Sequence, residues 1–282
     1  MAKIIDGKVL AEGVLSNVRQ RFQDLGRPVT LAIIRIGDDS ASIVYIRNKK
    51  LVAKKLGIAV KSFCLPKTTK SDEAASLIDG LNADENVDGI LLQLPLPNHL
   101  APRKLIDRIF PEKDVDGLTL VNQGKLFIND SSGMRPCTPT GIMHMIKSAG
   151  QDISGMHAIV LGRSQIVGKP LVQMLLQENC TVTNAHSYSQ DLPGVCRNGD
   201  IVISAVGKPQ FVQADWIKEG AIVIDVGINR DKHNKIVGDV DFLSISRIAR
   251  AISPVPGGAG PMTVAYLMHN VAEAATKQQR QK

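Results

Sequence analysis

The sequence has few cysteines and few aromatic residues, and it has no long apolar run. The four cysteines include no C-x-x-C pair and lie away from clustered histidines, which argues against a disulfide framework or a zinc site and fits a reducing cytoplasm. No apolar run approaches the ~18 residues of a membrane span. The first 13 residues lack the apolar core of a signal peptide. We therefore expect a cytoplasmic protein with no metal and no membrane contact.

The length and charge of the chain limit its class further. Its 282 residues suit two domains of moderate size, and a hydrophobic fraction of 44% allows each to bury a core. The net charge of +7 fits either a solvated surface with a basic tail or an attraction for anionic small molecules. Lys and Arg are dispersed and are not interleaved with aromatic residues, so we expect no nucleic-acid partner.

Strand-like and helix-like segments alternate along the chain. Strands are expected at 31–36, 60–65, 89–94, 158–161, 181–185, 201–205 and 221–226. Helices are expected at 42–56, 71–81, 170–178 and 262–276. This βαβ succession predicts an α/β protein with parallel sheets and helices on both faces. Residues 111–140 are rich in Pro, Gly, Asp and Asn, and we expect loops and a domain crossing there.

The segment 159–170 is typical of a strand, a tight turn and the start of a helix. Gly162 permits a sharp exit from the strand, and the N–H groups at the helix start would face a diphosphate. Two standard motifs do not fit. Ser164 occupies the second glycine position of G-x-G-x-x-G, and Pro170 follows Lys169 where a Walker A loop needs Ser or Thr. An ordinary βα turn remains the alternative.

The next strand indicates which dinucleotide would bind. NAD-binding folds place an acidic residue ~20 positions after this turn to hold the ribose hydroxyl. The sequence here is Asn184-Ala185-His186-Ser187-Tyr188, with no carboxylate. Because Arg163 and Ser187 can hold a 2′-phosphate instead, the pattern favours NADP over NAD.

A lysine stands on the apolar side of the expected helix 42–56. The charged face of this helix is made by Arg47, Lys50 and Lys54. Lys49 falls on the other face, one turn after Tyr45. Because burying a charged lysine is costly, it either snorkels, forms a structural ion pair, or has a lowered pKa suited to proton transfer. Spacing alone leaves all three open.

Two further polar residues are candidates to meet this lysine. Gln93 ends an apolar strand, and ligands of open α/β sheets bind beyond such strand ends. Asp116 lies in the polar turn 113–117. Each alone is more often structural, since a Gln can cap a strand end and Asp–Gly is a common turn.

The motifs taken in order resemble the bacterial bifunctional methylenetetrahydrofolate dehydrogenase/cyclohydrolase family over essentially the whole chain. The segments that carry this resemblance are Ile5-Asp6-Gly7-Lys8, Tyr45-x-x-x-Lys49, Gly89-Ile90-Leu91-Leu92-Gln93-Leu94-Pro95-Leu96-Pro97, Lys113-Asp114-Val115-Asp116-Gly117, Pro136-Cys137-Thr138-Pro139, Gly162-Arg163-Ser164 with Val167-Gly168, and Pro254-Val255-Pro256-Gly257-Gly258.

The resemblance implies two α/β domains with a cleft between them. Residues 1–140 would form a folate-binding and catalytic domain, completed by the C-terminal helix 262–282, and residues 141–261 a Rossmann-like NADP-binding domain. The protein would be a homodimer. It would use NADP to oxidise 5,10-methylenetetrahydrofolate to 5,10-methenyltetrahydrofolate and then hydrolyse that product to 10-formyltetrahydrofolate, in one-carbon metabolism and purine biosynthesis.

The resemblance also implies roles for single residues. Lys49 would catalyse the cyclohydrolase step, Gln93 would hydrogen-bond Lys49, Tyr45 would stack on the folate, and Asp116 would hydrogen-bond the pterin. The residues implied at the cofactor are Gly162, Arg163, Ser164, Gly168, Ser187 and Ile228. Those implied near folate and nicotinamide are Pro256, Gly257 and Gly258, in the loop 256–263. The chain departs from the family at Asn184-Ala185, Ala259 and Tyr188, the last where a basic residue is common.

Two alternatives remain from the residues alone. Another NADP-dependent dehydrogenase of this architecture, of the shikimate or amino-acid type, would not need Tyr45, Lys49, Gln93 and Asp116 together. A non-enzymatic nucleotide-sensing module would leave Lys49 unexplained.

Overall fold

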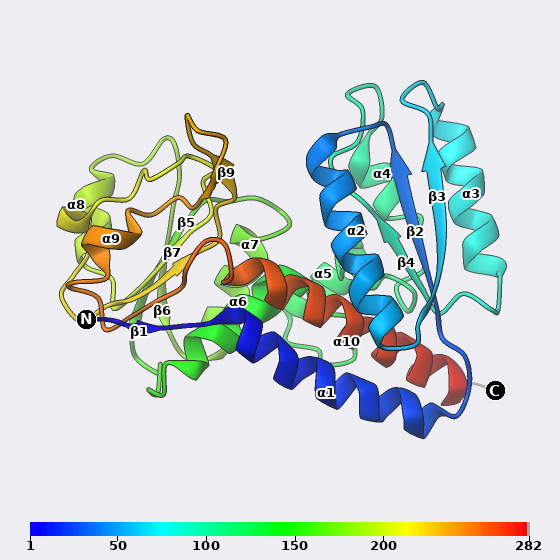
Figure 1. Cartoon of the computed structure of the whole chain (residues 1–282), viewed down its shortest axis with the longest axis horizontal. Helices are drawn as coiled ribbons and strands as arrows, with labels where there is room; N and C mark the ends of the chain where they lie inside the picture. Colours follow the sequence, from blue (N-terminus) through cyan, green and yellow to red (C-terminus); the bar gives the residue numbers. More distant parts are fainter. Residues whose placement is uncertain (281–282) are drawn as a thin grey trace. The chain divides into compact units, whose positions relative to one another are not determined.

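The computed structural model describes residues 1–280 and divides into two compact units (Figure 1). One, here called the six-stranded unit, contains Met1–Glu12 and Thr138–Thr263. The other, the three-stranded unit, contains Gly13–Cys137 and the residues from Val264 onward. Helices α1 (Gly7–Leu25) and α10 (Ala259–Arg280) contribute residues to both. Residues 281–282 of the expected C-terminal helix lie outside the described part.

The three-stranded unit is built on a parallel sheet in the order β3-β2-β4. Its strands are β2 (Thr30–Ile36), β3 (Ala59–Leu65) and β4 (Gly89–Leu92). Its helices, apart from the shared ones, are α2 (Ser40–Lys55), α3 (Ser71–Ala83), α4 (Pro102–Ile106) and α5 (Leu120–Phe127). These elements confirm the strands and helices expected in the first half, except that β4 ends two residues before position 94. Pro95 and Pro97 follow it, and neither has the N–H that a strand ladder needs.

Six α-helices of the described residues were not expected from the sequence, and two of them, α1 and α5, have clear start signals. Helix α5 lies inside the segment 111–140, so the expectation of loops was wrong for residues 120–127. It begins after Thr119, whose hydroxyl accepts a hydrogen bond from the N–H of Asn122 at 3.4 Å. Helix α1 begins after Asp6, whose carboxylate accepts from the N–H groups of Lys8 and Val9 at 2.8 and 3.2 Å. Both starts are helix N-caps of the usual kind.

The six-stranded unit has a parallel sheet in the order β1-β11-β8-β7-β5-β6. Its strands are β1 (Lys3–Ile4), β5 (His157–Leu161), β6 (Thr181–Ala185), β7 (Ile201–Ser204), β8 (Ile222–Asp225) and β11 (Ala251–Ile252). Its helices are α6 (Cys137–Ser148, which begins at the unit boundary), α7 (Gly168–Gln177), α8 (Leu192–Arg197), α9 (Phe242–Ile245) and the short 3₁₀ turn Ala214–Trp216. A separate antiparallel pair joins β9 (Asn229–Arg230) to β10 (Ile236–Val237).

The first residues of the chain belong with this second sheet. Strand β1 pairs in parallel with β11, so Met1–Glu12 lie in the six-stranded unit and not with the segment 1–140 in which the sequence-based division placed them. A strand of two residues has too little periodicity to be recognised from the sequence.

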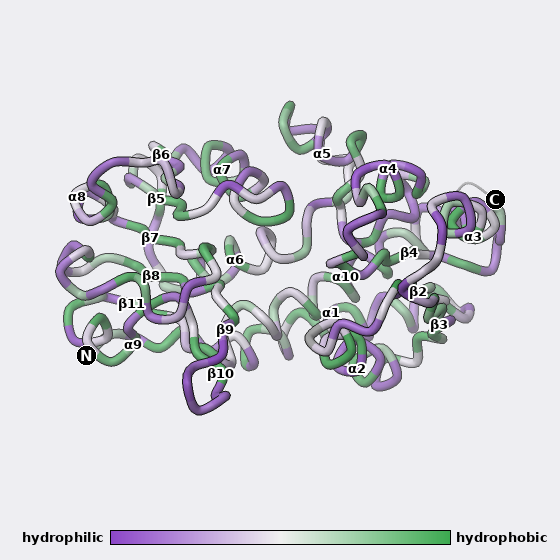
Figure 2. The backbone as a smooth tube through the Cα atoms, turned by 90° about the horizontal axis from the view of Figure 1, so that it is seen from above, coloured by the Kyte–Doolittle hydropathy of each residue, from purple (hydrophilic) through white to green (hydrophobic). Residues whose placement is uncertain are grey.

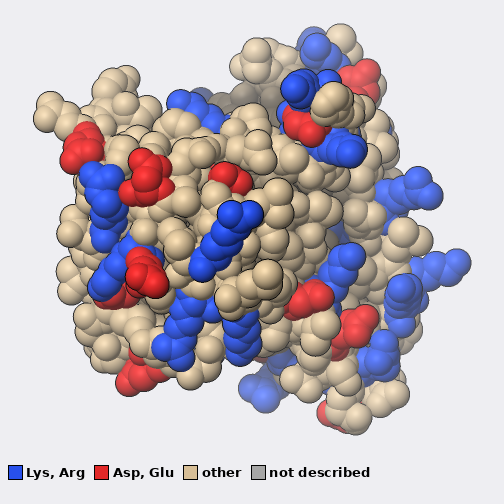
Figure 3. Space-filling model, turned by 60° about the vertical axis from the view of Figure 1, so that its left-hand side comes forward, with Lys and Arg blue, Asp and Glu red and all other residues tan. Residues whose placement is uncertain are grey.

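Each unit has its own apolar core. The central strands β7 and β8 are buried along their whole length, and Figure 2 shows hydrophobic residues around both. Among residues 1–280, no helix is long and apolar enough to cross a membrane. On the face shown in Figure 3, Lys and Arg side chains are interspersed with Asp and Glu side chains.

Candidate active site

Helix α2 places Lys49 and Tyr45 on one side, one turn apart. Its N-terminus is capped by Asp39, whose carboxylate accepts from the N–H of Ser42 at 2.8 Å. Lys49 is 7% exposed, so its side chain is buried and does not snorkel to water. Tyr45 is half-buried, and burial raises the pKa of its hydroxyl.

The amine of Lys49 has a defined partner at the end of β4. Its Nζ donates to Oε1 of Gln93 at 2.9 Å. The amide of Gln93 is oriented in turn, because its Nε2 donates to the carbonyl oxygen of Leu94 at 2.7 Å. Ser42 of α2 donates to the same carbonyl at 3.2 Å. The strand end and the helix are thus joined around a neutral acceptor that faces the lysine.

Asp116 is carried by a turn with many internal hydrogen bonds. The amine of Lys113 donates to the carbonyl oxygens of Leu81, Asn82 and Asp84 at 3.1, 2.8 and 2.8 Å. The carboxylate of Asp114 accepts from the N–H groups of Gly117 and Thr119 at 3.0 and 2.7 Å.

Gly117 closes this turn with a φ of +71°, and a Cβ there would clash with the backbone of Arg135. The motif Lys113–Gly117 is therefore a rigid turn that presents Asp116.

The charges of Lys49, Asp116 and Cys137 influence one another. Burial lowers the pKa of Lys49, while the negative charges of Asp116 and of a Cys137 thiolate oppose that change. Burial also raises the pKa of Asp116, and the positive charge of Lys49 opposes it. The pKa of the Cys137 thiol lies well above its usual range, first because it is buried and then because of Asp116. The cluster therefore holds an amine and a carboxyl that both ionise less readily than in water.

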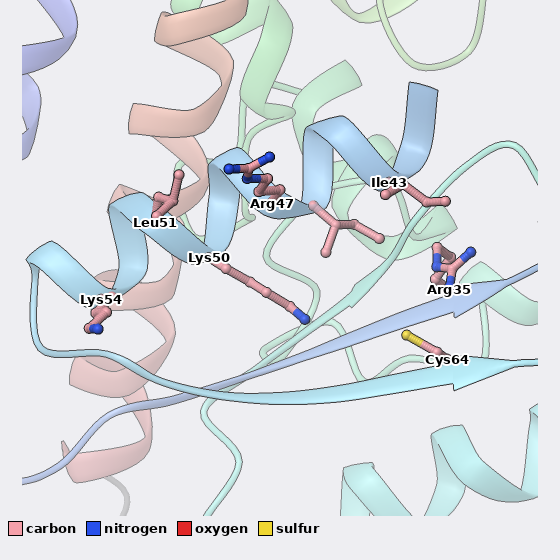
Figure 4. Close-up of a pocket in the computed structure, with 8 residues that line it drawn as sticks. Arg35, Ile43, Arg47, Lys50, Leu51, Lys54 and Cys64 are labelled. Atoms are coloured by element: carbon pink, nitrogen blue, oxygen red, sulfur yellow. The ribbon is translucent and has the colours of Figure 1, made fainter. Parts of the chain in front are cut away.

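The opposite side of α2 has a different character. A pocket of about 410 Å³ is lined there by Arg35, Ile43, Ile46, Arg47, Lys50, Leu51, Lys54 and Cys64. Figure 4 shows Lys50 extending from the helix toward the strands of the sheet. Lys49 and Lys50, adjacent in sequence, thus have different surroundings: a buried partner for one and an open basic pocket for the other.

The turn after β5 in the six-stranded unit has the features of a phosphate-binding loop. Gly162 has a φ of +112°, and a Cβ at Gly168 would clash with the carbonyl of Gly162, so both positions require glycine. The hydroxyl of Ser164 accepts from the N–H groups of Val167 and Gly168 at 3.1 and 3.3 Å, at the start of α7. Ser164 thus holds the loop together just before α7 begins, which the sequence alone did not indicate.

The neighbouring strand end supports this turn. The side-chain amide of Asn184 donates to the carbonyl oxygens of Val160 and Gly162 at 2.9 and 2.8 Å. This residue, a departure from the family pattern, therefore braces the loop. Ser187 is exposed, and the guanidinium of Arg163 lies over the ring of Tyr188, 5.5 Å from its centroid. Arg163 and Tyr188 form a cation–π pair beside the expected 2′-phosphate position.

The remaining residues that the resemblance places near the cofactor and the folate also lie in the six-stranded unit. Gly258 packs against Gly7, where a Cβ would clash with the Gly258 carbonyl, so the motifs at 5–8 and 254–258 meet in space. Pro256 is exposed and Gly257 has a φ of +109°. Ile228 is 50% exposed, as a residue that contacts a ligand can be. Within residues 1–280, no cluster of three or more His, Cys, Asp or Glu side chains is placed to hold a metal ion.

Sequence reasoning missed a buried pair of carboxylates near Ile228. Asp225 and Asp239 are 3% and 0% exposed. Asp225 accepts from the N–H groups of Gly227, Asp239 and Val240 at 3.0, 2.9 and 3.0 Å. Burial, with the nearby charge of Asp239, raises the pKa of Asp225 to about 7 against the opposing backbone hydrogen bonds. The available signal was an acid at the end of an apolar strand, the kind of position that singled out Gln93.

Comparison with known proteins now decides the family. Residues 5–116 match the model for the tetrahydrofolate dehydrogenase/cyclohydrolase catalytic domain, and residues 136–279 match the model for the NAD(P)-binding domain of the same enzymes. The chain belongs to the tetrahydrofolate dehydrogenase/cyclohydrolase family.

Full-length relatives agree with this family. A bifunctional protein FolD of Wolbachia sp. subsp. Drosophila simulans is 50% identical over 99% of this chain and 97% of the relative. The solved structure of the bifunctional enzyme FolD from Campylobacter jejuni is 39% identical, with a TM-score of 0.96 over 98% of this chain and 99% of that chain. FolD of Trypanosoma brucei, solved with NADP and an inhibitor, is 35% identical, with a TM-score of 0.94 over 99% of each chain. The expected fold class is confirmed, and the two alternative functions lose their support.

Proposed function

We infer that this chain catalyses two consecutive reactions of one-carbon metabolism. The first is the NADP-dependent oxidation of 5,10-methylenetetrahydrofolate to 5,10-methenyltetrahydrofolate, and the second is the hydrolysis of that product to 10-formyltetrahydrofolate. The observation that carries the proposal is the buried amine of Lys49, hydrogen-bonded to Gln93 and electrostatically coupled to Asp116. A dehydrogenase that only transfers a hydride has no need of such a lysine.

The cofactor belongs to the six-stranded unit in this proposal. The close approach of Gly162 and Gly168 makes a tight turn directly before α7, and the positive end of the helix dipole at this point suits a diphosphate. Arg163 and Ser187 would hold the 2′-phosphate, and Ile228 would contact the nicotinamide end. NADP supplies the hydride acceptor when it is bound. The loop residues Pro256, Gly257 and Gly258 would shape the region near folate and nicotinamide.

The folate belongs to the three-stranded unit. Tyr45 would stack on its aromatic part, and Asp116 would hydrogen-bond the pterin. The oxidation leaves a cation shared by two folate nitrogens and moves no proton, so binding and orientation are the main tasks of the protein in that step. This assignment follows the sequence-based division into a folate-binding part (1–140 and 262–282) and a cofactor-binding part (141–261), except that residues 1–12 belong to the six-stranded unit and so to the cofactor-binding part.

Hydrolysis of the methenyl cation requires proton transfer. Water adds to the bridging carbon and loses one proton to the neutral amine of Lys49. The carbon–N5 bond then breaks as the remaining hydroxyl proton moves to N5, which leaves the formyl group on N10. Lys49 returns the proton it accepted to solvent. Burial lowers the pKa of Lys49, so more of its amine is neutral than in water and can accept this proton, and Gln93 orients the amine without adding charge.

The test is a coupled assay of the purified protein. Methylenetetrahydrofolate and NADP should give NADPH and a transient methenyl absorbance that decays, and methenyltetrahydrofolate alone should give the same decay. Reactions without folate or without protein are the controls. Absence of NADPH formation with folded protein would refute the dehydrogenase, and a methenyl signal that decays no faster than in buffer would refute the cyclohydrolase.

Three further features stay predictions that rest on the family resemblance. They are a homodimer, a cytoplasmic location and the lack of a nucleic-acid partner. Light scattering during gel filtration measures the first directly. A mass of one chain across a wide concentration range would contradict it.

A further inference from the structure

A buried asparagine on helix α10 ties together two distant segments of the three-stranded unit. Asn270 is 5% exposed. Its Nδ2 donates to the carbonyl oxygens of Val115 and Arg135, both at 2.9 Å, and these lie 155 and 135 residues away in sequence. The same nitrogen is 3.5 Å from Sγ of Cys137. Since an amide NH₂ has two hydrogens, the two carbonyls use its donor capacity fully.

The two segments held by Asn270 carry groups of the proposed active site. Val115 directly precedes Asp116, and Arg135 lies two residues before Cys137. Cys137 also joins the two segments directly, because its thiol donates to the carbonyl oxygen of Val115 at 3.2 Å. Asp116 and Cys137 are also the two groups whose charges act on the Lys49 amine. The position of this lysine's electrostatic partners therefore depends on how the two segments are joined.

A second asparagine joins the same segments farther from Asp116. Asn122 of α5 is 2% exposed. Its Nδ2 donates to the carbonyl of Pro111 and to the carboxylate of Asp114, both at 2.9 Å, and its Oδ1 accepts from the N–H of Met134 at 3.0 Å. The 111–117 turn and the 134–137 segment are thus fastened at two points. Asn270 holds the point that adjoins Asp116 and Cys137.

We propose that Asn270 is a positioning residue for the folate reactions, which fixes Asp116 and Cys137 relative to Lys49. This rests on the function proposed above for Lys49 and Asp116. Asn270 touches neither reaction partner in this scheme and acts through the carbonyl groups that it holds. Without its amide, the carbonyl groups of Val115 and Arg135 each lose a donor and the turn is free to shift. A misplacement of about 1 Å at an active site costs as much as 10²-fold in rate.

The two reactions should respond differently to this change. Asp116 binds folate in the dehydrogenase and in the cyclohydrolase reaction, so the KM for folate should rise in both reactions. Hydrolysis also needs proton transfer at Lys49, so its kcat should fall by about 10- to 100-fold, well beyond the fall in the dehydrogenase kcat. The pH profile of hydrolysis should shift as well, because the charge of Asp116 acts on Lys49. A residue that only stabilises the fold would lower both activities in parallel with the folded fraction.

The experiment compares Asn270→Ala with the matched variant Asn82→Ala. Asn82 is also buried and bridges two backbone groups of this unit, the carbonyl of Arg108 at 2.8 Å and the N–H of Phe110 at 3.0 Å. Both variants lose similar bonds, so both should melt at lower temperature. At a temperature where circular dichroism shows both folded, only Asn270→Ala should lose hydrolysis preferentially and shift its pH profile.

Three results decide the matter. Wild-type turnover and pH profile in folded Asn270→Ala, or an equal loss in Asn82→Ala, would overturn the positioning role. If Asn270→Ala does not fold, Asn270→Ser takes its place, because a serine hydroxyl can donate to only one of the two carbonyls; full hydrolysis in folded Asn270→Ser would overturn the role equally. A wild-type protein without either activity would refute the proposed function itself, which separates that failure from this one.

Discussion

Replacing Lys49 by methionine tests the proposed chemistry most directly. Methionine keeps the length and apolar stem of lysine but removes the amine that donates to Gln93 at 2.9 Å. Because Lys49 is only 7% exposed, its charge is costly in the folded protein, and a methionine avoids that cost. The change should therefore remove the proton acceptor and leave the fold in place.

The expected magnitudes follow from these contacts. General acid–base groups typically contribute 10²–10⁴-fold, so hydrolysis should fall by at least about 100-fold, or about 2.7 kcal/mol in activation free energy. Losing the bond to Gln93 costs about 1–3 kcal/mol, but relief of the buried amine offsets it. We expect a net change in unfolding free energy of about 1 kcal/mol or less, which moves Tm by only about 2–4 °C. Dehydrogenase activity should remain measurable.

The assay follows NADPH and methenyltetrahydrofolate together in one reaction, with a separate thermal melt. The variant should form NADPH while methenyltetrahydrofolate accumulates. Lys50→Met is the matched control, because it makes the same substitution at the next residue, whose side chain lines the pocket on the other side of α2. That control should hydrolyse as the wild type does.

Each alternative reading of Lys49 gives a different result. A purely structural ion pair would make Lys49→Met lose stability and both activities together. Normal hydrolysis in a folded Lys49→Met variant would refute the proposed mechanism. Equal loss of hydrolysis in Lys50→Met would show that the effect is one of general charge and not of the buried amine.

Other expected outcomes concern the cofactor loop, the pterin contact and the buried acids. Arg163→Ala should weaken NADP binding much more than NAD binding in fluorescence titrations, and equal losses for both cofactors would contradict the assignment. Tyr188→Ala should weaken NADP binding by roughly two- to fivefold, because an exposed cation–π pair contributes about 0.5–1 kcal/mol. Asp116→Ala should raise the KM for folate in both reactions by the equivalent of about 1–3 kcal/mol. Unchanged folate affinity would mean that Asp116 has only a structural role in its turn. Asp225 has a pKa raised to about 7, so between about pH 4 and 7 it keeps its proton in the folded protein and loses it in the unfolded chain. Its contribution to the unfolding free energy is therefore full at low pH and is lost as the pH rises to about 7. In urea melts, the unfolding free energy of the wild type relative to Asp225→Asn should therefore drop by roughly 2–3 kcal/mol from pH 5 to pH 8, and a constant difference would mean that Asp225 stays ionised.

The sequence by itself determined the architecture and the family. Alternating apolar segments located β2, β3 and β4 and the helices between them, because helical and strand periodicity are local and are set by which face is buried. The same local argument placed Lys49 on the apolar side of its helix, and its burial confirms that placement. Glycine at 162 followed from the needs of a tight turn, which are also local.

Only the tertiary structure decided which of these residues meet. Gln93 is 44 residues from Lys49, and no periodicity relates them; the end of β4 beside α2 brings them to 2.9 Å. Helix α5 was hidden in a segment rich in turn-forming residues, because a cap at Thr119 and tertiary packing outweighed weak propensity. Asn270 gave no sequence signal at all. Its importance lies in two carbonyl groups, which every residue has, and only the folded chain shows which carbonyls a buried amide will reach.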